Sequence, residues 1–203
     1  MKKILAMLLA LVMVLSLAAC ASTQPAAEPA ASSDAPAESG KTYTVGVCQL
    51  VQHEALDAAT QGFVDALKEA LGDAVTIDVQ NASGDSVNCG TIVNGFVAKG
   101  VDLIMANATP ALTAAVSATA DIPILGTSIT AYGVALDIDD FNGTVGGNVS
   151  GTSDLADLQK QAQMILDWFP ETKTVGLLFC SAEPNSRYQI DEVRKALDRK
   201  SVV

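Results

Sequence analysis

The stretch Tyr43-Thr-Val-Gly-Val-Cys-Gln-Leu50 decides the fold class together with the segment that follows it, residues 55–71. The first stretch is a nearly continuous run of apolar and β-branched residues, which is typical of a strand buried on both faces. In the second, apolar residues recur at the spacing of one helical face: Ala59, Phe63, Ala66, Leu67 and Ala70. A buried strand followed by an amphipathic helix predicts the first β–α unit of a parallel sheet.

The same alternation continues along the chain. Strands are predicted at residues 75–79, 101–106, 122–125 and 134–138, and helices at residues 85–99 and 110–120. Gly100 ends one helix, and Pro110 lies where a helix tolerates the missing N–H group. Short loops between alternating strands and helices predict a doubly wound parallel sheet, which we assign to an N-terminal α/β lobe over residues 42–150.

A second β/α unit is predicted from residue 151 onward. Its helix opens with Gly151-Thr-Ser-Asp154 and runs to Phe169, a strand covers residues 174–180, and a helix covers residues 187–199. One strand cannot form an independent core. We therefore interpret residues 151–203 as the beginning of a second, truncated α/β lobe.

The N-terminus has the features of a bacterial lipoprotein signal. Lys2 and Lys3 precede an apolar run, and Leu17-Ala-Ala-Cys20 looks like a lipobox, which implies cleavage after residue 19 and lipid on Cys20. Residues 20–41, rich in Ala, Pro, Ser and Glu, are predicted to form a disordered tether. We expect an extracytoplasmic protein that is lipid-anchored to the cell membrane. An ordinary signal peptide with a chance cysteine is the alternative.

Composition excludes several classes of function. The 203 residues carry a net charge of −11 with 4% aromatic residues, which argues against nucleic-acid binding. His53 is the only histidine, so a multi-histidine metal site is excluded. There is no CxxC pair, and we interpret Cys48 and Cys180 as buried small residues rather than a disulfide. No cofactor is expected.

Candidate binding residues follow the predicted strands, because parallel sheets bind ligands beyond the carboxyl ends of their strands. The loops at residues 52–57, 81–83, 107–110 and 126–128 hold mostly uncharged hydrogen-bonding groups at helix starts. They suit a small polar or zwitterionic ligand, whose carboxylate favours a helix N-terminus. The alternative is that Asn107, Thr109 and Ser128 only cap helices.

The run from Val45 to Phe63 resembles the opening of ABC-transporter substrate-binding lipoproteins related to the tryptophan/tyrosine-binding group. Later motifs resemble that group in the same order: residues 107–110, 126–128, 151–154 and 181–186. The resemblance implies a type I periplasmic-binding fold, in which two lobes close on a ligand. It favours an amino acid, including an aromatic one, with Tyr132 and Tyr188 the nearest candidates for a stacking wall. Members of the group are longer and complete the second lobe.

The resemblance also implies a set of ligand-binding residues, carried over by position. In the first lobe they are Gln52, Glu54, Leu56, Asn107, Thr109, Pro110, Thr127 and Ser128, and in the second Thr152, Ser153, Asp154, Ser181, Glu183, Asn185 and Ser186. The implied partners are a small-molecule ligand and the membrane permease of an ABC importer. The protein is expected to be a monomer.

The sequence bears on two alternative functions. An enzyme is disfavoured because His53-Glu54-x-x-Asp57 lacks the second histidine of a zinc-protease helix, and the chain has no G-x-S-x-G or G-x-G-x-x-G motif. A ligand-sensing lipoprotein that partners a signalling receptor is the second alternative, because one fold serves both uses.

Overall fold

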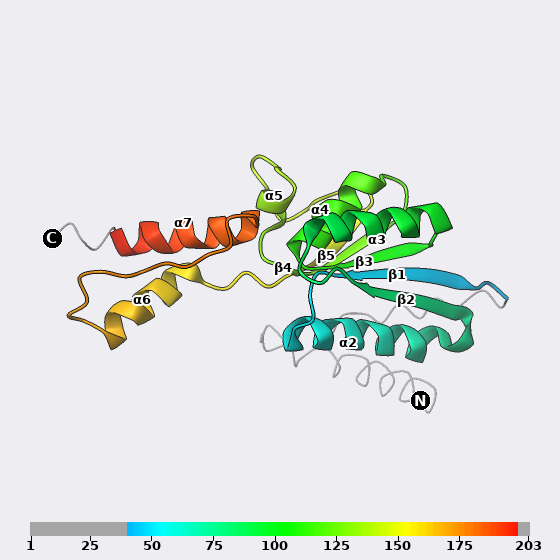
Figure 1. The fold of residues 1–203 in the computed structure, drawn as a ribbon, viewed down its shortest axis with the longest axis horizontal. Coiled ribbons are helices and arrows are strands. Elements are labelled where there is room, and N and C mark those ends of the chain that lie inside the picture. Colours follow the sequence, from blue (N-terminus) through cyan, green and yellow to red (C-terminus); the bar gives the residue numbers. More distant parts are fainter. Residues whose placement is uncertain (1–39, 199–203) are drawn as a thin grey trace, which may run out of the picture. The chain divides into compact units, whose positions relative to one another are not determined.

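A five-stranded parallel sheet forms the centre of the computed structural model, which describes residues 40–198 (Figure 1). The strand order is β2-β1-β3-β4-β5, and each neighbouring pair runs parallel. The strands are β1 (Tyr43–Gln49), β2 (Val75–Asn81), β3 (Leu103–Asn107), β4 (Ile124–Ile129) and β5 (Val149–Ser153). Because the strands are parallel, all their carboxyl ends meet at one edge of the sheet.

Helices cover both faces of this sheet, as a doubly wound fold requires. Helix α2 (Glu54–Leu71) lies on one face, and α3 (Ser86–Lys99) and α4 (Thr109–Ala118) lie on the other (Figure 1). On the α2 side, Val45, Val47 and Met105 of the sheet pack against Phe63 and Leu67. On the other side a larger core includes the buried side chains of Phe96, Ile104, Leu112, Ile124 and Ile129.

Local sequence signals set the helix ends. The ring nitrogen Nδ1 of His53 accepts a hydrogen bond from Ala55 N over 3.2 Å and caps α2. Asp85 caps α3 in the same way, accepting from Val87 N over 2.8 Å. Gly100 ends α3 in the left-handed conformation, with φ 64°. The predicted bounds of β1, α2, α3 and α4 agree with the structure to within a few residues.

The strand predicted at residues 134–138 is wrong. Residues Tyr132–Ala135 form the short helix α5, and the fifth strand of the sheet is β5 at Val149–Ser153. Tyr132 is buried in the core on the α3–α4 side of the sheet, whereas Val134 is exposed, so this short apolar run lacks the burial of an inner strand.

The helix predicted to open at Gly151-Thr-Ser-Asp154 is also wrong at its start. Residues 149–153 pair with β4, and α6 (Leu158–Trp168) begins after Asp157, whose side chain caps it. The expected lobe boundary between residues 150 and 151 therefore falls within β5.

Beyond α6, residues 171–180 contain no assigned strand, in contrast to the prediction for residues 174–180. Helix α7 (Pro184–Asp198) starts earlier than predicted and packs against α6 and α5. Cys180 is exposed, so its assignment as a buried residue is wrong, whereas Cys48 is buried as predicted.

Within residues 40–198, no helix is both long and apolar enough to cross a membrane. The predicted signal peptide, the lipid site at Cys20 and the tether up to residue 39 lie outside the described residues.

Candidate functional site

A buried hydrogen-bond network lies where β1 meets the start of α2. Gln49, the last residue of β1, donates from Nε2 to Oδ1 of Asp57 over 2.6 Å. Its Oε1 accepts from the hydroxyl of Thr60 over 2.6 Å. Both Gln49 and Thr60 are buried, so these bonds form in a low-dielectric environment and fix the first turns of α2 on the sheet edge.

Asn107, the last residue of β3, extends this network. Its Nδ2 donates to Oγ1 of Thr60 over 2.9 Å and to the carbonyl of Leu56 over 2.8 Å. Its Oδ1 is buried and has no hydrogen-bond partner, and the same is true of the hydroxyl of Thr109. Most buried polar atoms in proteins are paired, so two unpaired ones this close in sequence set this turn apart from the rest of the core.

The residue between them, Ala108, has an unusual backbone conformation. Its φ of 90° and ψ of 157° lie in a region that side-chain-bearing residues rarely adopt. The turn is held by the bond from Ala108 N to the carbonyl of Thr127, over 3.0 Å. Backbone strain of this kind is concentrated at functional sites.

The same turn presents the N-terminus of α4 at the carboxyl edge of the sheet. No side chain caps this helix, and Pro110 occupies its first turn. An uncapped helix start offers N–H groups and a positive partial charge, which together favour a carboxylate. Ser128, with φ 56°, follows Thr127 at an irregularity in the β4–β5 pairing, next to this turn along the sheet.

Two cavities lie near the carboxyl ends of the strands, and neither is lined by Asn107, Thr109 or Pro110. Gln52, Asp57, Thr60 and Asn81 line a cavity of about 330 Å³ at the ends of β1 and β2. Thr127 and Thr152 line another of about 310 Å³, together with Phe63 and Met105 on the α2 side of the sheet. Glu54 is exposed and Leu56 half-buried in the first turn of α2.

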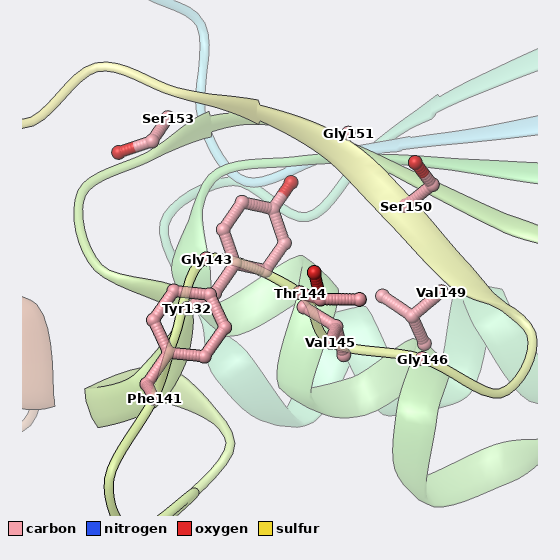
Figure 2. Close-up of a pocket in the computed structure, with 10 residues that line it drawn as sticks. All are labelled: Tyr132, Phe141, Gly143, Thr144, Val145, Gly146, Val149, Ser150, Gly151 and Ser153. Carbon is pink, nitrogen blue, oxygen red and sulfur yellow. The ribbon is translucent and has the colours of Figure 1, made fainter.

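A third cavity, of about 510 Å³, lies between β5 and the loop at residues 141–146 (Figure 2). Figure 2 shows the Tyr132 ring pointing toward β5 beside Gly151. Its hydroxyl donates to the carbonyls of Gly126, over 3.0 Å, and Thr152, over 3.3 Å. Burial raises the pKa of Tyr132 to about 12. Through these two bonds, Tyr132 holds β5 against β4.

Ser153 and Asp154, at the end of β5, are also engaged in holding the sheet edge. Ser153 Oγ donates to the carbonyl of Thr130 over 2.8 Å and accepts from Leu155 N over 3.3 Å. The backbone N–H of Asp154 donates to the carbonyl of Ile129 over 3.0 Å, and its side chain is exposed.

The candidate residues at positions 181–186 gather at the start of α7. Ser181 is exposed, Ser186 Oγ accepts from Cys180 N over 3.0 Å, and Asn185 has a buried Oδ1 without a partner. The backbone N–H of Glu183 donates to the carbonyl of Cys180 over 3.3 Å. None of these four line the cavities that hold Gln52 and Thr127.

One link joins α7 to the end of β4. Gln189 Nε2 lies 3.4 Å from Oγ1 of Thr130, and Tyr188 lines a cavity of about 310 Å³ that Tyr132 and Ser153 also line. The two tyrosines that the sequence singled out therefore share one cavity, although the hydroxyl of Tyr132 is already bonded to backbone.

Sequence reasoning did not assign Gln49 or Thr60 to the site, and it included Asp57 only as part of the loop at residues 52–57. A signal was present in Gln49, because a glutamine that ends an otherwise apolar buried strand needs a polar partner. Asp57 and Thr60 lie three residues apart on α2, a spacing that places both on the face toward that glutamine.

Residues 44–202 match the family of ABC transporter substrate-binding proteins. The chain belongs to this family. Its members bind solutes and are not enzymes, which excludes the enzymatic alternative. The chain is 36% identical over 199 residues to a tyrosine-binding protein of Clostridioides difficile (strain R20291). That match covers 95% of this chain and 56% of the relative, so the chain spans about half the length of the curated relative it matches.

Solved structures of this family give the same result. The ABC domain from Streptococcus pneumonia in complex with L-Trp is 36% identical and superposes with a TM-score of 0.72, covering 79% of this chain and 55% of that one. The predicted resemblance to the tryptophan/tyrosine-binding group is thus confirmed.

The type I periplasmic-binding fold is confirmed as well. A fructose-binding periplasmic domain of a hybrid two-component system, 14% identical, superposes with a TM-score of 0.53 over 77% of this chain and 50% of its own. At that identity the likeness concerns the fold alone and does not favour a sensing role.

Proposed function

We propose that this substrate-binding protein captures an amino acid, aromatic ones included, and delivers it to the permease of an ABC importer. The names of the relatives support the ligand class, since one is a tyrosine-binding protein and another was solved with L-Trp. The observation that carries the proposal is the pair of buried, unpaired polar atoms, Asn107 Oδ1 and Thr109 Oγ1, at the uncapped start of α4.

The chemistry of this turn suits an α-amino acid. The helix start and the Thr109 hydroxyl would donate hydrogen bonds to the ligand carboxylate. Asn107 Oδ1 is an acceptor and would receive a bond from the ligand ammonium group. Because both atoms are shielded from water, each bond made there counts for more than one at the surface. No covalent bond is made or broken.

The remaining candidate residues would contact the ligand from two sides. Gln52, Glu54, Leu56, Pro110, Thr127 and Ser128 would surround the ligand on the side of α4. Thr152, Ser153, Asp154, Ser181, Glu183, Asn185 and Ser186 would face it from a second lobe. Closure of the lobes would exclude water and present the closed form to the permease.

The proposed setting follows from the family. Substrate-binding proteins of ABC importers are extracytoplasmic, and lipid on Cys20 would hold a monomer near its permease. A stable anchor of this kind needs more than one acyl chain.

The test is a thermal melt of the full chain with L-tryptophan, L-tyrosine, L-phenylalanine and several aliphatic amino acids. A ligand that binds only the folded state raises the melting temperature, and the rise grows with its concentration. We expect a rise with at least one aromatic amino acid. A cooperative melt that no amino acid shifts would contradict the proposed ligand class.

A variant pair locates the site. Thr109→Val removes the unpaired hydroxyl and keeps the shape of the side chain, so the melting temperature without ligand should hold while affinity falls at least about tenfold. Thr91→Val, on the exposed face of α3, is the matched control and should bind like the unaltered chain. Unchanged affinity in Thr109→Val would place the ligand elsewhere.

A further inference from the structure

Two cysteines from different elements meet in the core. Cys48 is the sixth residue of β1, and Cys89 lies in the first turn of α3, where its N–H donates to the carbonyl of Asp85 over 3.2 Å. Both side chains are fully buried in the same core and both are free thiols. The side chain of each cysteine shifts the pKa of the other, so the two thiols lie close together.

We propose that Cys48 and Cys89 close into a disulfide that ties β1 to α3 once the protein has left the cytoplasm. The two thiols lie in one core, on two elements that pack against each other, and proximity is the first requirement of this bond. The oxidising conditions outside the membrane allow such bonds to form and persist. This inference does not depend on which ligand the protein binds.

The two thiols differ in pKa and in access to solvent, and these differences decide which one attacks the oxidant first. The side chain of Cys48 is the largest influence on the pKa of Cys89 and lowers it, although burial acts in the opposite direction. The side chain of Cys89, together with burial, raises the pKa of Cys48. Cys89 also directly follows the exposed residues 83–88, so a small oxidant reaches it first and it is the thiol that attacks first.

The step balances with a small disulfide as oxidant. The Cys89 thiolate attacks one sulfur of oxidised glutathione, forms a mixed disulfide and releases one reduced glutathione. Cys48 then loses its proton, attacks the Cys89 sulfur and releases the second reduced glutathione. The protein loses two hydrogen atoms, and the oxidant gains them.

A small oxidant reaches the buried thiols through the first turn of α3, which has low intrinsic helix stability. Gly90 and Gly95 lower the intrinsic stability of this helix, and the residues before Cys89, at positions 83–88, are exposed. Local opening of a first turn of this kind admits a small oxidant without global unfolding. Closing the bond would then fix α3 and the loop that leads from Asn81, beside the candidate site.

The test oxidises the purified full chain in mixtures of oxidised and reduced glutathione, then blocks free thiols with N-ethylmaleimide in denaturant. Peptide mapping by mass spectrometry should find the Cys48 and Cys89 peptides joined in rising proportion as the mixture becomes more oxidising. The exposed Cys180 should not join either peptide. The oxidised chain should melt about 5–10 °C higher than the reduced chain.

Substitutions of single cysteines test which pair forms the disulfide. Cys180→Ser should retain both the linked peptides and the melting difference, and Cys89→Ala should lose both. Should Cys89→Ala fail to fold, Cys48→Ala gives the same test from the other partner. Two fully blocked thiols at every mixture, or a bond from Cys48 to Cys180, would overturn the proposal. Either result would leave the proposed ligand binding untouched.

Discussion

Nδ2 of Asn107, at the end of β3, lies 2.9 Å from Oγ1 of Thr60 in the second turn of α2. The same hydroxyl donates to Oε1 of Gln49 at the end of β1. One side chain of α2 thus joins the neighbouring strands β1 and β3 at the edge where the unpaired atoms of Asn107 and Thr109 lie. The geometry of the candidate site depends on this contact, because it fixes the amide plane of Asn107.

Removing that hydroxyl should cost stability. Thr60→Val keeps the volume of the side chain but leaves Gln49 Oε1 and one donor of Asn107 without a partner. We expect the free energy of unfolding in urea to fall by about 1–3 kcal/mol. Thr91→Val, at an exposed position of α3, should change it by less than about 0.5 kcal/mol. Equal effects at both positions would show that the buried network contributes nothing.

A pair of glycine substitutions should act in opposite directions. A Cβ at Gly46 of β1 would come within 2.5 Å of the buried Phe96 ring, so Gly46→Ala should destabilise by about 1–3 kcal/mol or more. At Gly62 in α2 there is no atom within 4 Å of such a Cβ. Gly62→Ala should therefore stabilise by about 0.5–1 kcal/mol. Urea unfolding of both variants measures the sign directly.

Tyr132 should make stability fall at alkaline pH. Its pKa in the folded protein is raised to about 12 by burial, above the value of about 10 in an unfolded chain. The neutral phenol therefore contributes stability that is fully present below about pH 10 and is lost as the pH rises toward 12.

Tyr132→Phe isolates this contribution. The variant loses the hydroxyl bonds to Gly126 and Thr152 and should be less stable at neutral pH by about 1 kcal/mol. The gap between the unaltered chain and the variant should shrink as the pH rises above about 10. A gap that stays constant across this range would mean that Tyr132 does not titrate as the structure indicates.

The ion pair between Asp78 of β2 and Lys99 of α3 should act at acid pH. Nζ of Lys99 lies 2.7 Å from Oδ2 of Asp78, and this hydrogen bond is the main cause of the lowered pKa of Asp78. A lowered pKa means stability that is present above about pH 4 and lost as the pH falls. Because both side chains are partly exposed, Lys99→Met should cost less than about 1 kcal/mol at neutral pH.

The control for this pair is Lys68→Met, at an exposed position in the last turn of α2. The stability difference that Lys99→Met introduces should disappear at about pH 2, where the carboxylate is protonated. A difference that is the same at neutral and acid pH would instead point to lost packing of the lysine stem.

The elements with a clear hydrophobic period were predictable from the sequence. In β1 an apolar run corresponds to strong burial, and the structure has β1 and α2 within a residue of the prediction. The predicted face of α2 is less buried than its pattern suggests, because only Thr60 and Val64 of this helix are buried and Ala66 and Ala70 are exposed. The edge strand β5 could not be found in this way, since Val-Ser-Gly-Thr-Ser carries no apolar alternation and is mostly exposed. It is a strand because β4 offers a pairing edge, which is tertiary information.

The errors at residues 134–138 and 174–180 have a related cause. Both are short apolar runs, and periodicity cannot distinguish a strand from a helical turn at that length. Leu178 is 98% exposed, so residues 174–180 have strand composition without a sheet to join. In the candidate site, Asn107 and Thr109 were predictable from their place after a strand, whereas the Gln49–Thr60 bond depends on how α2 docks.

The backbone of Ala108 has a consequence for how this sequence can evolve. A φ of 90° tolerates glycine and strains every larger residue, and the side chain is only 9% exposed. The substitution that this position accepts without added strain is therefore Ala108→Gly, which removes one methyl group. Asn107 and Thr109 have no positive φ, so the restriction at Ala108 comes from the backbone, whereas that at Asn107 comes from its hydrogen bonds to Leu56 and Thr60.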